Sequence, residues 1–209
     1  MTAGLLLVGA SGLAREVIAA GIAGVTGILD DDANLHDTDI AGVHVLGGTA
    51  LAGEREEQVL LCIGPSGARA EVARRMARVG VADDRYATFV ARTARVGATS
   101  DIAAGSILLD GVVVTADARI GRHVVVMPNC TITHDDKLDD FVTLAAGVAL
   151  GGGVRIGERA YLGMNASVRP GVTIARDSTI GMGAVVLRDV PEGETWAGVP
   201  ARRLGGRND

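Results

Sequence analysis

His134 is followed directly by two acidic residues, Asp135 and Asp136. A carboxylate beside an imidazole favours the protonated ring and can fix its tautomer, which is how proteins prepare a general base. The same arrangement is typical of an exposed turn histidine flanked by acids, so the residue types alone leave both interpretations open. We expect another histidine, His123, to point outward without a further role.

A glycine-rich turn follows the first apolar run of the chain, residues 5–8, and contains Ser11. Such a turn before a helix offers backbone N–H groups to an anion. Asp30 follows the next apolar run about 20 residues later, and Gly64 follows a third. Ligands of parallel sheets bind beyond the carboxyl ends of the strands, where these three residues should lie. Glycine can also serve such a turn for steric reasons alone, so this motif leaves ligand binding open.

The elements that must position these residues alternate along the first part of the chain. Apolar runs at 5–8, 25–29 and 59–63 predict strands, and residues 14–23 and 68–79 have helical composition. Alternating strands and helices predict a small parallel sheet with helices on its faces. We therefore expect a Rossmann-like α/β domain over residues 1–90.

A six-residue repeat occupies the remainder of the chain. Every sixth residue from Val96 to Val186 is Val, Ile or Leu, and the residue four places after each is small, with Asp136 as the exception. One large and one small inward position per repeat predict a prism of stacked parallel strands, a parallel β-helix over residues 91–209. By this period Asp136 should point inward, which makes it a second candidate to meet the neighbouring imidazole.

Glycines that directly follow aliphatic positions form a second feature of the repeat. Gly97 and Gly121 are two of them. Because glycine tolerates turn conformations that a side chain would resist, we expect these residues to form the tight corners of the prism.

The repeat resembles the hexapeptide-repeat acyltransferases, whose Gly-x-Pro-Ala-basic ending is similar to Gly198 to Arg202 here. That resemblance implies a left-handed β-helix of about 18 residues per coil and a homotrimer with active sites between subunits. With the N-terminal domain added, the chain resembles acetyltransferases that act on nucleotide-linked amino sugars and their sialic acid O-acetyltransferase relatives. The resemblance implies an acetyl-CoA-dependent enzyme that transfers acetyl to the amino group of a nucleotide-linked amino sugar.

The same resemblance assigns roles to individual residues. His134 would be the general base, and Asp135 would raise its basicity. Acetyl-CoA would contact residues of the later coils, Thr143, Met164 and Met182. The nucleotide sugar would lie on the N-terminal domain against Ser11, Gly12, Leu13, Ala14, Asp30, Asp31 and Gly64. Leu13 and Thr143 stand where the family usually or often has histidine.

Composition excludes several other classes of protein. A net charge of -5 with 2% aromatic residues argues against nucleic acid as a partner. Two cysteines without a motif fit a reducing, cytoplasmic location, and the apolar runs are too short to span a membrane. A metal enzyme resembling γ-type carbonic anhydrases would need three histidines at its site, whereas the repeat holds two, so we expect no metal. Sugar O-acetylation and a non-catalytic scaffold are the alternative functions.

Overall fold

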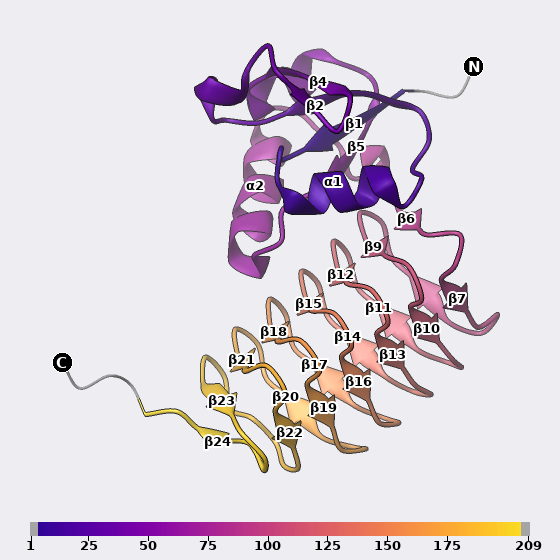
Figure 1. Ribbon diagram of the computed structural model, residues 1–209, viewed down its shortest axis with the longest axis vertical. Coiled ribbons are helices and arrows are strands. Elements are labelled where there is room, and N and C mark those ends of the chain that lie inside the picture. Colours follow the sequence, from indigo (N-terminus) through magenta and orange to yellow (C-terminus); the bar gives the residue numbers. More distant parts are fainter. Residues whose placement is uncertain (1–3, 206–209) are drawn as a thin grey trace.

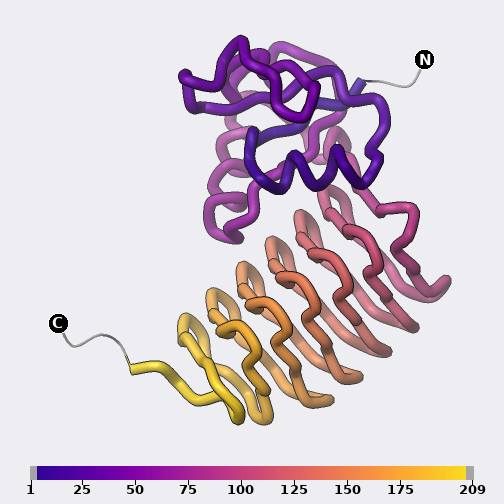
Figure 2. Tube along the Cα trace, viewed as in Figure 1, coloured from indigo at the N-terminus to yellow at the C-terminus, as the bar shows by residue number. Residues whose placement is uncertain are grey.

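The computed structural model describes residues 4–205. An N-terminal α/β unit lies over the first coils of a parallel β-helix (Figure 1). The chain then winds away from this unit in successive coils toward the C-terminus, as the trace in Figure 2 shows. The described chain thus contains an α/β unit followed by a β-helix.

The N-terminal unit contains a five-stranded sheet in the order β3-β4-β2-β1-β5. Four strands are parallel, and β3 pairs antiparallel at one edge. Its elements are β1 (Leu5–Val8), α1 (Gly12–Ala19), β2 (Val25–Leu29), β3 (Asp39–Ile40), β4 (Val43–Gly47), β5 (Gln58–Leu61) and α2 (Ser66–Arg78), with 3-10 turns at Ala33–Leu35, Thr49–Glu54 and Asp83–Arg85. The prediction of a parallel sheet with helices is confirmed, both helices begin two residues earlier than predicted, and β3 and β4 were not predicted.

The two sides of this sheet face different neighbours. On one side, Leu7 of β1 packs with α1 residue Val17 and with Ile107 and Val125 of the β-helix. The core on the other side contains side chains of α2, including Met76. The core on the first side therefore contains residues of both the sheet and the β-helix, and it joins the two units.

The β-helix has three flat faces, here called A, B and C. Face A contains β6 (Phe89–Val90), β9 (Ile107–Leu108), β12 (Val125–Val126), β15 (Thr143–Leu144), β18 (Tyr161–Leu162), β21 (Thr179–Ile180), β23 (Thr195–Ala197) and β24 (Arg202–Arg203). Face B contains β7 (Arg95–Val96), β10 (Val113–Val114), β13 (Thr131–Ile132), β16 (Ala149–Leu150), β19 (Ser167–Val168) and β22 (Val185–Val186). Face C contains β8 (Asp101–Ile102), β11 (Arg119–Ile120), β14 (Lys137–Leu138), β17 (Arg155–Ile156) and β20 (Thr173–Ile174).

Neighbouring strands of each face pair in parallel one coil apart, as Val113 with Thr131 shows, except that β24 pairs antiparallel with β23. The aliphatic positions from Leu108 to Val186 are all buried, which confirms the predicted inward face of the repeat. Asp136 is also fully buried, as its place in the period predicted. The interior is therefore a continuous stack of aliphatic side chains with a single carboxylate in it among the described residues.

The corners close through left-handed backbone conformations at fixed places. Positive φ angles recur every six residues from Gly105 to Gly183, and Asp135 has one of 63°. Gly97 and Gly121 are not among these residues, so their predicted turn role is wrong. A Cβ on Gly97 would lie 1.6 Å from the carbonyl oxygen of Thr115 in the next coil. These glycines are needed for close contact between coils and not for backbone freedom.

Candidate active site

His134 lies on the corner between faces B and C, two residues after the end of strand β13. Its Nδ1 hydrogen-bonds Oδ2 of Asp135 at 2.8 Å, and both side chains are exposed. The hydrogen bond to the carboxylate of Asp135 raises the pKa of His134 above its ordinary value. When Nδ1 donates to the carboxylate, Nε2 carries the lone pair, so this pair can present a basic nitrogen to a substrate.

Asp136 has a different task. Its Oδ2 accepts a hydrogen bond from the backbone N–H of Thr133 at 2.7 Å, and its Oδ1 accepts one from Val154 at 2.8 Å in the next coil. Ser106 holds the amide of Val124, also one coil later, in the same way at the corner before face A. Burial raises the pKa of Asp136 to about 6. Asp135 is therefore the hydrogen-bond partner of the imidazole, and Asp136 is the partner of backbone amides at the corner.

Gly152 is a part of this corner that the sequence analysis missed. A Cβ on Gly152 would lie 2.4 Å from both Cε1 and Nε2 of His134. The imidazole therefore rests over a position in the next coil that only glycine leaves free. Counting one coil of residues forward from His134 would have found it, because residues at this separation stack directly in the repeat.

The three expected acetyl-CoA contacts divide between two environments. Met164 and Met182 lie on the corner between faces A and B and are exposed by 47% and 69%. Thr143 is buried on face A, where its hydroxyl donates to the carbonyl of Gly64 at 3.1 Å. Thr143 and Met164 both line a cavity of about 800 Å³. This cavity also has walls from α1 and from the loop after β5, so it lies between the two units.

The expected nucleotide-sugar residues on the N-terminal unit are partly engaged in holding the fold. Ser11 caps α1 and donates to the carbonyl of Cys62, while Asp30 accepts the amide of Ala10 at 2.7 Å. Leu13 and Ala14 are buried, because they form the inner side of α1. Gly12 is exposed at the start of that helix, and Gly64 lines the cavity between the units.

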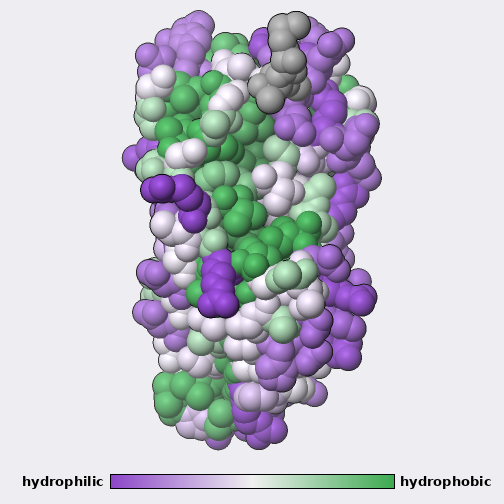
Figure 3. Space-filling view, turned by 90° about the vertical axis from the view of Figure 1, so that its right-hand side faces the viewer, coloured by the Kyte–Doolittle hydropathy of each residue, from purple (hydrophilic) through white to green (hydrophobic). Residues whose placement is uncertain are grey.

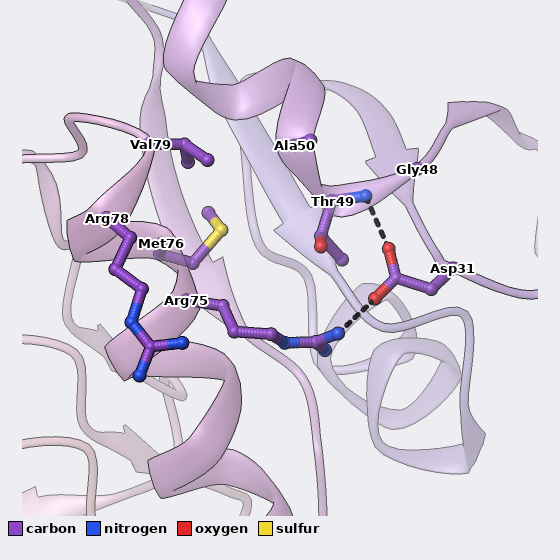
Figure 4. Close-up of a pocket in the computed structure, with 8 residues that line it drawn as sticks. All are labelled: Asp31, Gly48, Thr49, Ala50, Arg75, Met76, Arg78 and Val79. Atoms are coloured by element: carbon purple, nitrogen blue, oxygen red, sulfur yellow. Dashed lines mark hydrogen bonds and ion pairs between the residues drawn. The ribbon is translucent and has the colours of Figure 1, made fainter.

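Asp31 lies in a second cavity of about 450 Å³, at the ends of β2 and β4 (Figure 4). Its Oδ1 accepts the amide of Thr49 at 2.8 Å, and its Oδ2 pairs with Arg75 of α2 at 2.9 Å. These contacts lower its pKa despite the opposing effect of burial. The carboxylate of Asp31 is therefore fixed in position at the rim of the cavity. Arg78, which lies on α2 like Arg75, also lines this cavity.

His123 is not an exposed surface residue, and that prediction is wrong. The side chain is 3% exposed, stacked on Phe141 with ring centroids 5.0 Å apart and in edge contact with Tyr86. The N-terminal unit covers this corner of the β-helix, so a repeat position that would otherwise face solvent is buried. Burial lowers the pKa of His123 to about 4.

Within one chain, the structure does not bring His134 to the other candidates. His134 lies on the corner between faces B and C, whereas Met164 and Met182 lie at the opposite edge of face B. The cavity between the units opens on face A. His134 and the two methionines therefore lie at opposite edges of face B within one chain.

Comparison with known proteins agrees with this architecture. Residues 153–188 match the family described as "Bacterial transferase hexapeptide (six repeats)". The perosamine N-acetyltransferase of Caulobacter crescentus, solved with CoA and GDP-perosamine, is 30% identical, with 97% of each chain covered and a TM-score of 0.89. The acetyltransferase domain of PglB from Neisseria gonorrhoeae, in complex with acetyl coenzyme A, is 29% identical, with 98% of this chain and all of that one covered and a TM-score of 0.88. The chain belongs to the hexapeptide-repeat acetyltransferases, which have the left-handed β-helix fold.

A curated relative, the UDP-3-O-acylglucosamine N-acyltransferase of a Caulobacter species, is 34% identical over 110 residues. The match covers 47% of this chain and 32% of the relative, so the chain spans about a third of that protein's length. Similarity over both the N-terminal unit and the β-helix therefore comes from the solved structures, whereas the curated match covers about half the chain.

Residues 4–205 contain neither a candidate membrane span nor a candidate metal site. No helix in that range is long and apolar enough to cross a membrane. Nor does the described part of the chain bring three His, Cys, Asp or Glu side chains together as metal ligands.

Proposed function

We propose that this protein is an acetyl-CoA-dependent acetyltransferase that acetylates the amino group of a nucleotide-linked amino sugar. The hydrogen-bonded pair of His134 and Asp135, exposed on a corner of the β-helix, carries the proposal. Similarity along nearly the whole chain to an N-acetyltransferase solved with CoA and GDP-perosamine supports the choice of substrates. A cytoplasmic location stays a prediction from composition.

The reaction needs one proton acceptor. The amine lone pair attacks the thioester carbonyl carbon, and the C–S bond breaks as the amide forms. Nε2 of His134 takes the proton that the attacking nitrogen loses. The leaving thiolate of CoA takes a proton from this imidazolium or from water, so that free thiol is released and the base returns to its neutral form. Asp135 stabilises the imidazolium through Nδ1, so the ring stays in one orientation during the transfer.

We assign the acceptor to the N-terminal unit and the thioester to the β-helix. Residues 1–90 would form a Rossmann-like domain that binds the nucleotide sugar, and residues 91–209 the acetyltransferase domain. Gly64 at the cavity between the units and Asp31 at the ends of β2 and β4 are the acceptor contacts best placed for this. Met164 and Met182 present exposed thioether side chains to the pantetheine arm on the corner between faces A and B.

A homotrimer completes the site, because the base and the coenzyme corner lie at opposite edges of face B. The outward side chains of this face beyond its first strand carry no charge: Val113, Thr131, Ala149, Ser167 and Val185. Those of face C are mostly charged: Asp101, Arg119, Lys137, Arg155 and Thr173. Figure 3 shows neutral and hydrophobic colours over much of one side, with hydrophilic residues along an edge. Uncharged faces suit subunit contact, so we assign face B to the trimer.

The direct test is to incubate the protein with acetyl-CoA and UDP-, GDP- or CMP-linked amino sugars in turn. Release of free CoA thiol and a product heavier by one acetyl group are expected for one nucleotide class. The hydroxyl analogue of the same sugar, with oxygen in place of the amine, separates N- from O-acetylation. Absence of thiol release with every acceptor would refute the proposed reaction and favour a scaffold.

A further inference from the structure

Arg69 of α2 is fully buried and has no acidic partner among the described residues. Burial alone lowers its pKa to about 9, so it is charged at neutral pH. A buried cation is normally paired with a carboxylate, because taking a charge out of water is costly. Here the charge is held entirely by neutral oxygen atoms.

The guanidinium joins the loop after β5 to the β-helix. Nη1 donates to the carbonyls of Ile63 at 2.6 Å and Gly64 at 2.7 Å. Nε donates to the carbonyl of His123 at 2.8 Å, and Nη2 to that of Phe141 at 3.0 Å one coil later. One planar group therefore fixes the position of the loop relative to two successive coils.

A second set of bonds links the same group to the cavity wall. Nη2 of Arg69 donates to Oγ1 of Thr143 at 2.9 Å, and that hydroxyl donates to the carbonyl of Gly64. Ser66 also donates to the Thr143 hydroxyl, at 2.9 Å. Gly64, Ser66 and Thr143 all line the cavity between the units. The shape of that cavity therefore depends on where Arg69 holds its acceptors.

We propose that Arg69 is a positioning residue, which sets the acceptor-binding loop at residues 63–66 in register with the β-helix. This inference rests on the proposed function for its kinetic consequence. Its geometric basis is the rigid guanidinium group, whose five N–H groups can donate hydrogen bonds to carbonyls in several directions at once. A lysine would keep the charge and lose this rigid group, so the loop would no longer be held on both sides.

The test compares Arg69→Lys with Arg74→Lys, a matched control on the exposed side of the same helix. For Arg69→Lys we expect the KM for the acceptor to rise about tenfold or more and the KM for acetyl-CoA to stay within about twofold. Thr143→Val, which removes a hydroxyl and keeps the shape, should raise the acceptor KM by a smaller factor. Arg74→Lys should change neither constant. If both KM values rise equally, or neither rises, the positioning role is refuted.

Hydrogen exchange provides a readout that does not depend on catalysis. The amides of the loop and of the first turn of α2 should exchange faster in Arg69→Lys than in the parent, while those of β16 to β22 should be unchanged. If the parent protein proves inactive with every nucleotide sugar, the proposed function fails, yet this measurement still decides the role of Arg69. Unchanged exchange in the loop would overturn it. Should Arg69→Lys fail to fold, the same two measurements on Thr143→Val decide the outcome.

Discussion

The imidazole of His134 lies directly over Gly152 of the next coil, where a Cβ would come within 2.4 Å of Cε1 and Nε2. Because this ring is exposed, it can turn away from a new methyl group at little cost in stability. We expect Gly152→Ala to leave the thermal midpoint nearly unchanged and to lower kcat by about 10-fold to 100-fold, the usual cost of a misplaced catalytic group.

A double variant separates this effect from a general defect. If the methyl group acts through His134, adding Gly152→Ala to His134→Ala should cause no further loss of rate. Two independent losses that multiply would show that Gly152 serves the reaction in another way.

Replacement of the base itself should abolish most of the rate and preserve the fold. His134→Ala is expected to lower kcat by about 10² to 10⁴, with acetyl-CoA binding by calorimetry unchanged. His44→Ala is a matched control, because His44 also bonds an aspartate through Nδ1, at 3.0 Å to Asp39, and lies in the N-terminal unit. Near-full activity of His134→Ala at saturating acceptor would contradict the assignment of the base.

The two aspartates after His134 should differ in their effect on pH dependence. The base must be neutral to work, so activity falls as pH drops through its raised pKa. Asp135→Asn removes the hydrogen-bonded charge that is the main cause of that rise, and the acidic limb of kcat/KM should move to lower pH. Asp136 contributes through charge alone, so Asp136→Asn should move the limb less; a larger shift for Asp136 would reverse the assignment.

His123 should make the fold sensitive to acid. Its folded pKa of about 4 lies below the ordinary value of 6.5, so the unfolded state binds a proton that the folded state does not. Stability from this group is present above pH 6.5 and is lost as pH falls toward 4, by about 3 kcal/mol. In His123→Phe, which keeps a ring between Tyr86 and Phe141, the fall in unfolding free energy between pH 7 and pH 4 should be smaller by that amount. Equal falls in denaturant titrations of both proteins would contradict it.

Assembly can be tested with charges on two faces. Ala149→Arg places a cation in the middle of face B and should dissociate the trimer, as light scattering would show. Thr173→Arg places the same charge on face C and should leave the trimer intact. A parent protein that is monomeric at micromolar concentration would remove the basis for a shared site.

The period of the sequence predicted the coils because each coil repeats the same local requirement. Leu108 to Val186 fill the interior at intervals of six residues, and even Asp136 lies where the period puts it. His123 was placed wrongly because its burial comes from Tyr86 and α2, which approach from the other unit. No feature within the repeat reports that contact. Strands β3 and β4 were missed since one has two residues and the other alternates around an exposed His44.

The sequence predicted which residues belong to the candidate site, but it did not predict where each of them lies in the structure. The sequence pointed to His134 with Asp135, and the hydrogen bond between them fits. It did not show that Ser11 and Asp30 already bind backbone groups, because such bonds depend on the loop conformation. Nor did it indicate that Thr143 lies beneath the N-terminal unit, joined to Gly64 and Arg69.

The one-coil spacing between His134 and Gly152 also limits how such a protein can change its length in evolution. A single inserted residue within a strand would turn every later aliphatic side chain away from the interior, whereas a whole duplicated coil keeps every side chain on its face. A coil duplicated after Val186 would lengthen the prism and leave the cavity, Arg69 and the base at their present separations. A coil duplicated between Val125 and His134 would carry the base about 4.8 Å farther from the N-terminal unit. Insertions between Val125 and His134 should therefore be selected against more strongly than insertions toward the C-terminus.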